Sequence, residues 1–198
     1  RGHCFVRYAD DANVYVRSRR AGERVMELLR SLYAKLHLTV NETKSAVASV
    51  FGRKFLGFSF WAAPKGEIKC KVAAKPLATF KQRIRQLTCR SGGRSMADVV
   101  ERLRPYVLGW KAYFRLAQTP KIWRTLDEWL RHRLRAIRLK HWKRGTTMYR
   151  ELKALGAPET VARQVAANSR RWWRNSDRLL KTVLTIAYFD RLRVPRIS

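Results

Sequence analysis

Two adjacent carboxylates, Asp10 and Asp11, are the residues of this sequence whose type and spacing suit metal chemistry. Strand-like runs flank them at 4–8 and 13–16, which predicts a β-hairpin with an acidic turn. Paired carboxylates repel each other unless a cation neutralises them, and Mg²⁺ prefers such oxygen ligands. Neighbouring strand residues point to opposite faces, so one carboxylate is expected to dominate. The alternative is an ordinary turn, or one paired with a nearby Lys or Arg, because Asp is common in turns.

The segment after the hairpin combines a helix with further strands. Short strands are expected at 38–40, 54–61 and 68–72, with a turn at Pro64-Lys65-Gly66 between the last two. A helix is predicted over 21–37, because apolar residues there fall on a single stripe, at Val25, Leu28, Leu29, Leu32 and Leu36.

From Lys75-Pro76 onward the pattern is helical almost throughout. Ser95 and Asp98 have the spacing of a capping box, and Pro105 either interrupts that helix or starts a second one. The fold class is therefore predicted to be α+β, with β-hairpins and a packed helix followed by an all-α region. The expected helices cover 77–87, 95–114, 122–142, 149–155, 158–168 and 176–189.

The charge of the chain is its most unusual property. Its 198 residues carry a formal net charge of +30, whereas the apolar fraction of 46% is ordinary and allows a core. Self-repulsion on this scale favours a polyanionic partner, and a phosphate backbone fits best. A membrane surface is the weaker alternative, and no apolar run is long enough for a membrane span. Three cysteines without a CxxC motif argue against a disulfide framework or a zinc site, and favour a reducing compartment.

Several blocks resemble group II intron-encoded reverse transcriptases/maturases. The run Tyr8-Ala9-Asp10-Asp11 after an apolar strand resembles their catalytic motif, and 36–44 and 55–58 resemble the next two family blocks in order and spacing. The runs 104–114 and 127–135 resemble the maturase-specific region. The resemblance implies the end of a reverse-transcriptase palm at 1–75, thumb and maturase-specific helices at 76–145, and a basic helical RNA-binding region at 146–198.

The resemblance also implies roles for individual residues. Asp10 and Asp11 would be catalytic ligands of Mg²⁺, with Tyr8 and Ala9 near the nucleotide and the primer end. Lys44 is a candidate for a nucleotide or primer phosphate, or else a solvated loop lysine. Gly57 would let the primer backbone approach, or else is a strand glycine at a bulge.

The third carboxylate of the family's metal site and the fingers have no match in this sequence. A chain that starts at Arg1 and enters a strand directly is expected to be a fragment. On its own it is not expected to polymerise DNA, and a missing N-terminal polymerase half is a possible partner.

Basic residues gather in the later helices without acids among them. Like charges one turn apart destabilise an isolated helix, so an anionic ligand is favoured over a merely solvated face. Trp172 and Trp173 are adjacent, so one of them is the better candidate to stack on RNA, although tryptophan at helical spacing is more often core. The predicted RNA-binding residues are Arg131, Arg135, Arg138, Lys140, Lys143, Arg144, Arg171, Trp172 and Arg174.

Two functions follow as expectations. The first is RNA-directed DNA polymerase chemistry with Mg²⁺, using an RNA template, a DNA primer and dNTPs, coupled to binding of group II intron RNA. The second is an RNA-binding splicing cofactor, a maturase without polymerase activity. A basic RNA-binding protein of ribosomal type is a third reading, but it leaves the acidic hairpin unexplained. The expected location is the bacterial cytoplasm, in association with nucleic acid.

Overall fold

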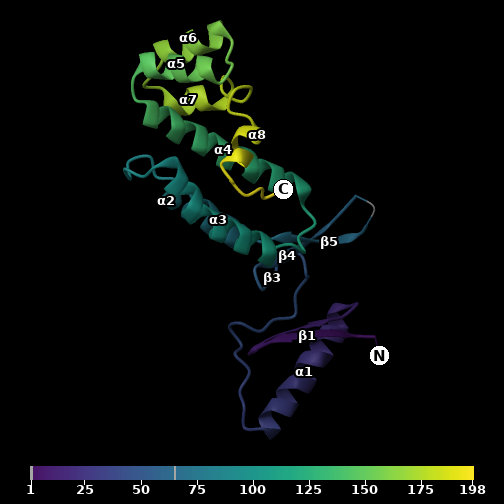
Figure 1. The fold of residues 1–198 in the computed structure, drawn as a ribbon. Helices are drawn as coiled ribbons and strands as arrows, with labels where there is room; N and C mark the ends of the chain where they lie inside the picture. The colour runs from purple at the N-terminus through teal and green to yellow at the C-terminus, as the bar shows by residue number, and fades with distance from the viewer. Residues whose placement is uncertain (1, 65) are drawn as a thin grey trace. The chain divides into compact units, whose positions relative to one another are not determined.

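The computed structural model describes residues 2–64 and 66–198, so Lys65 of the expected turn lies outside the described residues. The chain divides into two compact units, Arg1–Arg53 and Lys54–Ser198 (Figure 1). Each unit is built around its own elements, and together they give the predicted mixture of helices and small antiparallel sheets.

The first unit consists of the predicted hairpin and helix. Strands β1 (Cys4–Tyr8) and β2 (Asp11–Tyr15) are antiparallel, with Tyr8 opposite Asp11. Helix α1 (Arg19–Lys35) begins after Ser18, whose hydroxyl accepts a hydrogen bond from the Ala21 backbone N–H.

The segment that follows α1 has no strand at 38–40, so that prediction was wrong. Leu38 is exposed there, and the residues are irregular because no strand of the described chain pairs with them. The segment packs back on α1 instead. A Cβ on Gly22 would lie 2.6 Å from a methyl group of Val47, so α1 has glycine where the returning chain crosses it.

The second unit begins with a three-stranded antiparallel sheet in the order β3-β4-β5. Its strands are β3 (Lys54–Phe55), β4 (Phe58–Ala62) and β5 (Ile68–Val72). The single strand predicted at 54–61 is thus two strands. A two-residue turn separates them, because Leu56 and Gly57 both have positive φ, at 49° and 77°, as a tight hairpin of this kind requires.

Helices make up the rest of the second unit. Ser95 and Asp98 form the predicted capping box at the start of the third helix, which continues through Pro105 without a second start. The prediction of one helix over 176–189 was wrong: residues 178–184 form turns and a bend, and only the two ends of that range lie in helices. The helices are α2 (Ala74–Leu87), α3 (Met96–Tyr113), α4 (Pro120–Trp142), α5 (Gly145–Ala154), α6 (Glu159–Ala167), α7 (Trp172–Asp177) and α8 (Ile186–Arg191).

Helix α4 lies at the centre of the core of this unit (Figure 1). Its predicted inward residues, Leu126, Leu130, Leu134 and Ile137, are all buried. Each such side chain contributes about 1.5–3 kcal/mol to stability relative to an exposed position. The core contacts come from α2, α3, α5 and α8, through Phe80, Leu103, Met148 and Phe189. Among the described residues, no helix is both long enough and apolar enough to cross a membrane.

Candidate nucleic-acid interface

At the tip of the β1–β2 hairpin, Asp10 and Asp11 occupy different positions, one in the turn and one on a strand. Ala9 and Asp10 are the central residues of a two-residue turn, and Ala9 has a φ of 52°. Arg7 Nε donates a 2.8 Å hydrogen bond to the Ala9 carbonyl and so ties down the turn. Asp11 is already the first residue of β2. Asp10 therefore occupies the apex of the turn, whereas Asp11 lies on the strand beside it.

Both carboxylates are open to solvent. Among residues 2–64 and 66–198, no ion pair engages either of them. Their oxygens are of the kind that Mg²⁺ prefers, and their exposure leaves room for water and phosphate around an ion. The same described residues contain no group of three His, Cys, Asp or Glu side chains that could hold a metal. The hairpin thus presents two exposed carboxylates, and the described residues bring no third ligand beside them.

Two further predicted contact residues of the first unit are accessible. The Tyr8 side chain, at the end of β1, is 62% exposed. Lys44 is exposed in a turn that Asn41 organises, because Asn41 Oδ1 accepts hydrogen bonds from the backbone N–H groups of Thr43 and Lys44. The Asn41 side chain therefore fixes the backbone of Lys44, whereas the Lys44 side chain stays in solvent.

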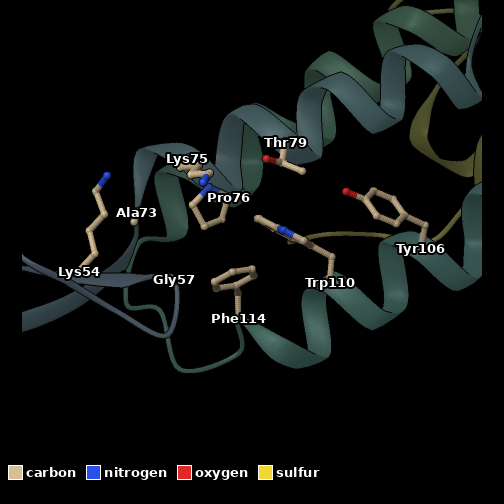
Figure 2. Close-up of a pocket in the computed structure, with 9 residues that line it drawn as sticks. All are labelled: Lys54, Gly57, Ala73, Lys75, Pro76, Thr79, Tyr106, Trp110 and Phe114. Atoms are coloured by element: carbon tan, nitrogen blue, oxygen red, sulfur yellow. The ribbon is translucent and has the colours of Figure 1, made fainter. Parts of the chain in front are cut away.

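Gly57, in the second unit, lines a hollow of about 450 Å³ together with aromatic residues (Figure 2). A Cβ on Gly57 would lie 3.2 and 3.3 Å from ring atoms of Phe114 and 3.3 Å from Pro76 Cγ. Its φ of 77° belongs to the β3–β4 turn. Packing alone therefore explains a glycine at position 57, because any larger residue would crowd Phe114 and Pro76.

Two of the predicted RNA-binding arginines are buried in the second unit. Arg131 is 8% exposed, and its guanidinium lies 3.6 Å from the Asp127 carboxylate. Arg135 is 5% exposed, and its Nε donates a 3.0 Å hydrogen bond to the Leu184 carbonyl. Burial, reinforced by the charge of Arg131, lowers the pKa of Arg135 to about 10. Both side chains therefore have contacts within the protein.

Arg138, Lys140 and Trp172 are half-buried. The Arg138 guanidinium lies over the Tyr188 ring, 5.7 Å from its centroid, and Lys140 Nζ lies 5.1 Å from the centroid of Trp172. Trp172 packs against the main core. Of the two adjacent tryptophans, Trp173 is the more accessible, with 43% of its surface exposed, and its ring stacks on His132 at a centroid distance of 3.7 Å.

The remaining predicted cations are exposed and mark two places on this unit. Lys143 and Arg144 form the connection between α4 and α5, where Lys143 has a φ of 57°. Arg171 and Arg174 lie at the start of α7 and within it. These four residues are free to contact a large anion without unpacking the core.

Sequence reasoning did not include Arg85 and Arg90 among the candidates. Arg85, at the end of α2, and Arg133 of α4 both lie over the ring of Trp129, at 5.6 and 5.4 Å. Arg90, in the α2–α3 loop, lies 5.9 Å from the centroid of the Trp172 ring. Tertiary packing brings these cations together from separate segments, so no local spacing could have indicated them.

The comparisons with known proteins bear on this helical unit. A comparison of the whole chain with curated proteins gave no significant match. Residues 77–156 match the family model described as "Group II intron, maturase-specific domain". The matched range runs from α2 to the end of α5 and includes the motif-bearing runs 104–114 and 127–135. This part of the chain is therefore similar to the maturase-specific domain of group II introns.

Proposed function

We propose that this protein binds group II intron RNA and assists its splicing through the basic helical unit, residues 54–198. The observation that carries the proposal is the match of residues 77–156 to the maturase-specific domain. The charge of the chain supports it, because a formal net charge of +30 calls for a polyanionic partner. The exposed cations Lys143, Arg144, Arg171 and Arg174 provide accessible contacts for phosphate groups.

Binding of this kind depends steeply on salt. Each phosphate that a Lys or Arg neutralises releases condensed counterions, so affinity falls as salt concentration rises. A folded intron offers phosphates in a fixed arrangement, and a protein that binds this arrangement stabilises the folded RNA relative to unfolded forms. Assistance to splicing then follows from differential binding of the folded intron.

The test compares a group II intron RNA with a scrambled RNA of the same length and composition. We expect tighter binding of the intron by the full chain, and faster intron splicing at a low Mg²⁺ concentration where the RNA alone splices poorly. Replacing Arg171 and Arg174 with Gln is expected to weaken binding and flatten its salt dependence. Equal affinity for both RNAs, with no effect on splicing, would leave only a general polyanion binder.

A second function, RNA-directed DNA synthesis, is proposed for the hairpin of the first unit. Its support is the exposure of Asp10 and Asp11 on a tight turn without an ion pair among the described side chains. Mg²⁺ bound there would stabilise the charge that develops during nucleotidyl transfer. Asp10 and Asp11 would each present carboxylate oxygens, and Tyr8 would contact the primer end or the dNTP.

This second function is tested in a protein supplemented with a polymerase segment that provides the fingers and a third carboxylate. With an RNA template, a DNA primer and dNTPs, Asp10→Ala is expected to abolish cDNA synthesis and to leave RNA binding unchanged. Glu27→Ala is the matched control, because Glu27 is an exposed acid on α1 of the same unit. Intact synthesis by the Asp10 variant would remove the enzymatic assignment and leave the maturase function in place.

A further inference from the structure

Two tryptophans of the helical unit hold cations that come from different elements. Arg85 of α2 and Arg133 of α4 lie over Trp129. Arg90 of the α2–α3 loop and Lys140 of α4 lie over Trp172. We call these six residues the indole–cation cluster. Attraction between a cation and an aromatic ring positions each charged group without neutralising its charge.

Arg133 lies close enough to Arg85 and Arg90 for their positive charges to repel its own. Arg133 is half-buried, and its Nε donates a 2.6 Å hydrogen bond to Thr88 Oγ1. Its pKa is lowered by burial first, and then by the positive charges of Arg85 and Arg90. None of the ion pairs among the described residues includes any of the cluster's four cations. The fold therefore concentrates positive charge here without an acid to balance it.

The indole N–H of Trp172 also lacks a partner in this cluster. Its indole Nε1 is buried and has no hydrogen-bond acceptor among the described residues. An indole N–H can only donate, so a buried one without an acceptor is costly. Arg90 and Lys140 already lie over the ring of this half-buried tryptophan. Its geometry suits holding these cations better than stacking on a nucleobase.

We propose that the indole–cation cluster is a binding site for a phosphate group of the RNA backbone. This inference rests on the proposed RNA-binding function and assigns that function a location. Guanidinium groups match the geometry of phosphate oxygens, and Arg85 and Arg90 present exposed N–H donors from α2 and the α2–α3 loop. Arg133 adds positive charge behind them, because its Nε and Nη2 already donate to Thr88 and to the Arg85 carbonyl. The two tryptophans of the cluster are half-buried and have cations over their rings, so they do not form the exposed apolar face that a lipid surface requires. This favours a nucleic-acid phosphate over a lipid headgroup.

The test uses the full chain and the double variant R85Q/R90Q. Both residues are exposed, so the change removes two charges without opening the core. The control is R150Q/R163Q, which removes the same charge from two exposed arginines that are paired with Glu151 and Glu159. The probe is a short fluorescein-labelled RNA hairpin, with binding measured by anisotropy over a series of KCl concentrations.

We expect R85Q/R90Q to lose about tenfold or more in affinity, and the slope of log affinity against log salt to become shallower by about one to two. The control is expected to change affinity far less, and R85K/R90K to recover part of the loss. Equal losses in R85Q/R90Q and in the control would overturn the site, because binding would then follow net charge alone. A wild-type chain that does not bind the hairpin, or an intron RNA, would instead overturn the proposed function itself.

Competition distinguishes the source of the phosphate. Unlabelled RNA is expected to displace the hairpin from the wild-type chain at far lower phosphate concentrations than inorganic phosphate, because a polymer contacts several cations at once. If inorganic phosphate displaced the labelled RNA hairpin at phosphate concentrations as low as unlabelled RNA required, an RNA-backbone site would be contradicted. A melting curve for each variant serves as the folding check.

Discussion

The carboxylate of Asp127 accepts a 2.8 Å hydrogen bond from the backbone N–H of Ser198, 71 residues further along the chain. The same oxygen, Oδ2, also accepts a hydrogen bond from the Ser198 hydroxyl, and the other oxygen, Oδ1, accepts a 2.8 Å bond from the Ile197 N–H. Asp127 is 1% exposed and lies in α4. Together with Lys111 Nζ, which donates to the Arg196 and Ser198 carbonyls, it fixes the segment 194–198 to the core.

Replacement of Asp127 by Asn is expected to destabilise the helical unit. Asparagine keeps one acceptor oxygen but places an NH₂ group where a second acceptor is needed, and it leaves Arg131 without its carboxylate. Loss of one buried partner of this kind costs about 1–3 kcal/mol, and more where a charge is left unpaired. Urea denaturation measures the loss, and faster amide exchange is expected over 194–198.

The matched control for this substitution is Asp177→Asn. Asp177 is an α7 residue with a half-exposed side chain that pairs with Lys181 at 3.6 Å, and such surface pairs contribute about 0–1 kcal/mol. If the Asp127 and Asp177 variants lost the same free energy of unfolding, the buried hydrogen bonds would not be what holds the segment.

Gly57→Ala separates a structural role for this residue from a role in primer contact. We expect a loss of about 1–2 kcal/mol from the positive φ, with a further loss because the new methyl group meets Phe114 and Pro76. Gly66→Ala is the control, because Gly66 has the same φ of 77° but open space around its Cβ position. The melting temperature of the Gly57→Ala variant should therefore be lower than that of the Gly66→Ala variant. Equal stability of the two variants, with weaker primer binding only in the first, would favour primer contact.

Local patterns predicted much of the fold. The apolar stripe predicted helix α1, and the spacing of Ser95 and Asp98 predicted the start of α3. The apolar periodicity of α4 predicted its buried face, which consists of Leu126, Leu130, Leu134 and Ile137. These features depend on residues within a few turns of each other, which a sequence displays directly. The prediction of a single strand at 54–61 was wrong because the chain turns at Leu56 and Gly57. The run is apolar on both sides of this turn, so its composition does not indicate where the strand ends.

The candidate interface was less accessible to sequence reasoning. A basic run on α4 looks uniform, but Arg131 and Arg135 face inward, whereas Arg138 is half-buried. Which of these cations is covered depends on α7, α8 and the segment 194–198, which come from the distant end of the sequence. Tertiary packing also decided that Trp173 is more exposed than Trp172.

The contrast between buried and exposed arginines predicts opposite phenotypes. Arg135→Ala leaves a cavity and an unpaired Leu184 carbonyl, so we expect a loss of about 2–3 kcal/mol in stability. The slope of RNA affinity against salt should not change, provided that binding is measured well below the melting temperature. Arg174→Ala, on the exposed part of α7, should keep stability within about 0.5 kcal/mol and reduce the slope. The reverse pattern would place Arg135 in the RNA contact.

His141 should make the helical unit sensitive to acid. Burial lowers its pKa below the ordinary value of 6.5, the charge of Arg138 lowers it further, and a hydrogen bond to the Arg94 backbone opposes the shift. Because the unfolded chain then binds the proton more tightly than the folded one, the stabilisation is present above about pH 6.5 and is lost as the pH falls from there toward the folded-state pKa. We expect a lower urea midpoint at pH 5.5 than at pH 7.5, and a smaller difference in His141→Gln. The control is His37→Gln, an exposed histidine of the other unit. An unchanged pH dependence in the His141 variant would show that its ring carries the same proton affinity in the folded and unfolded chain.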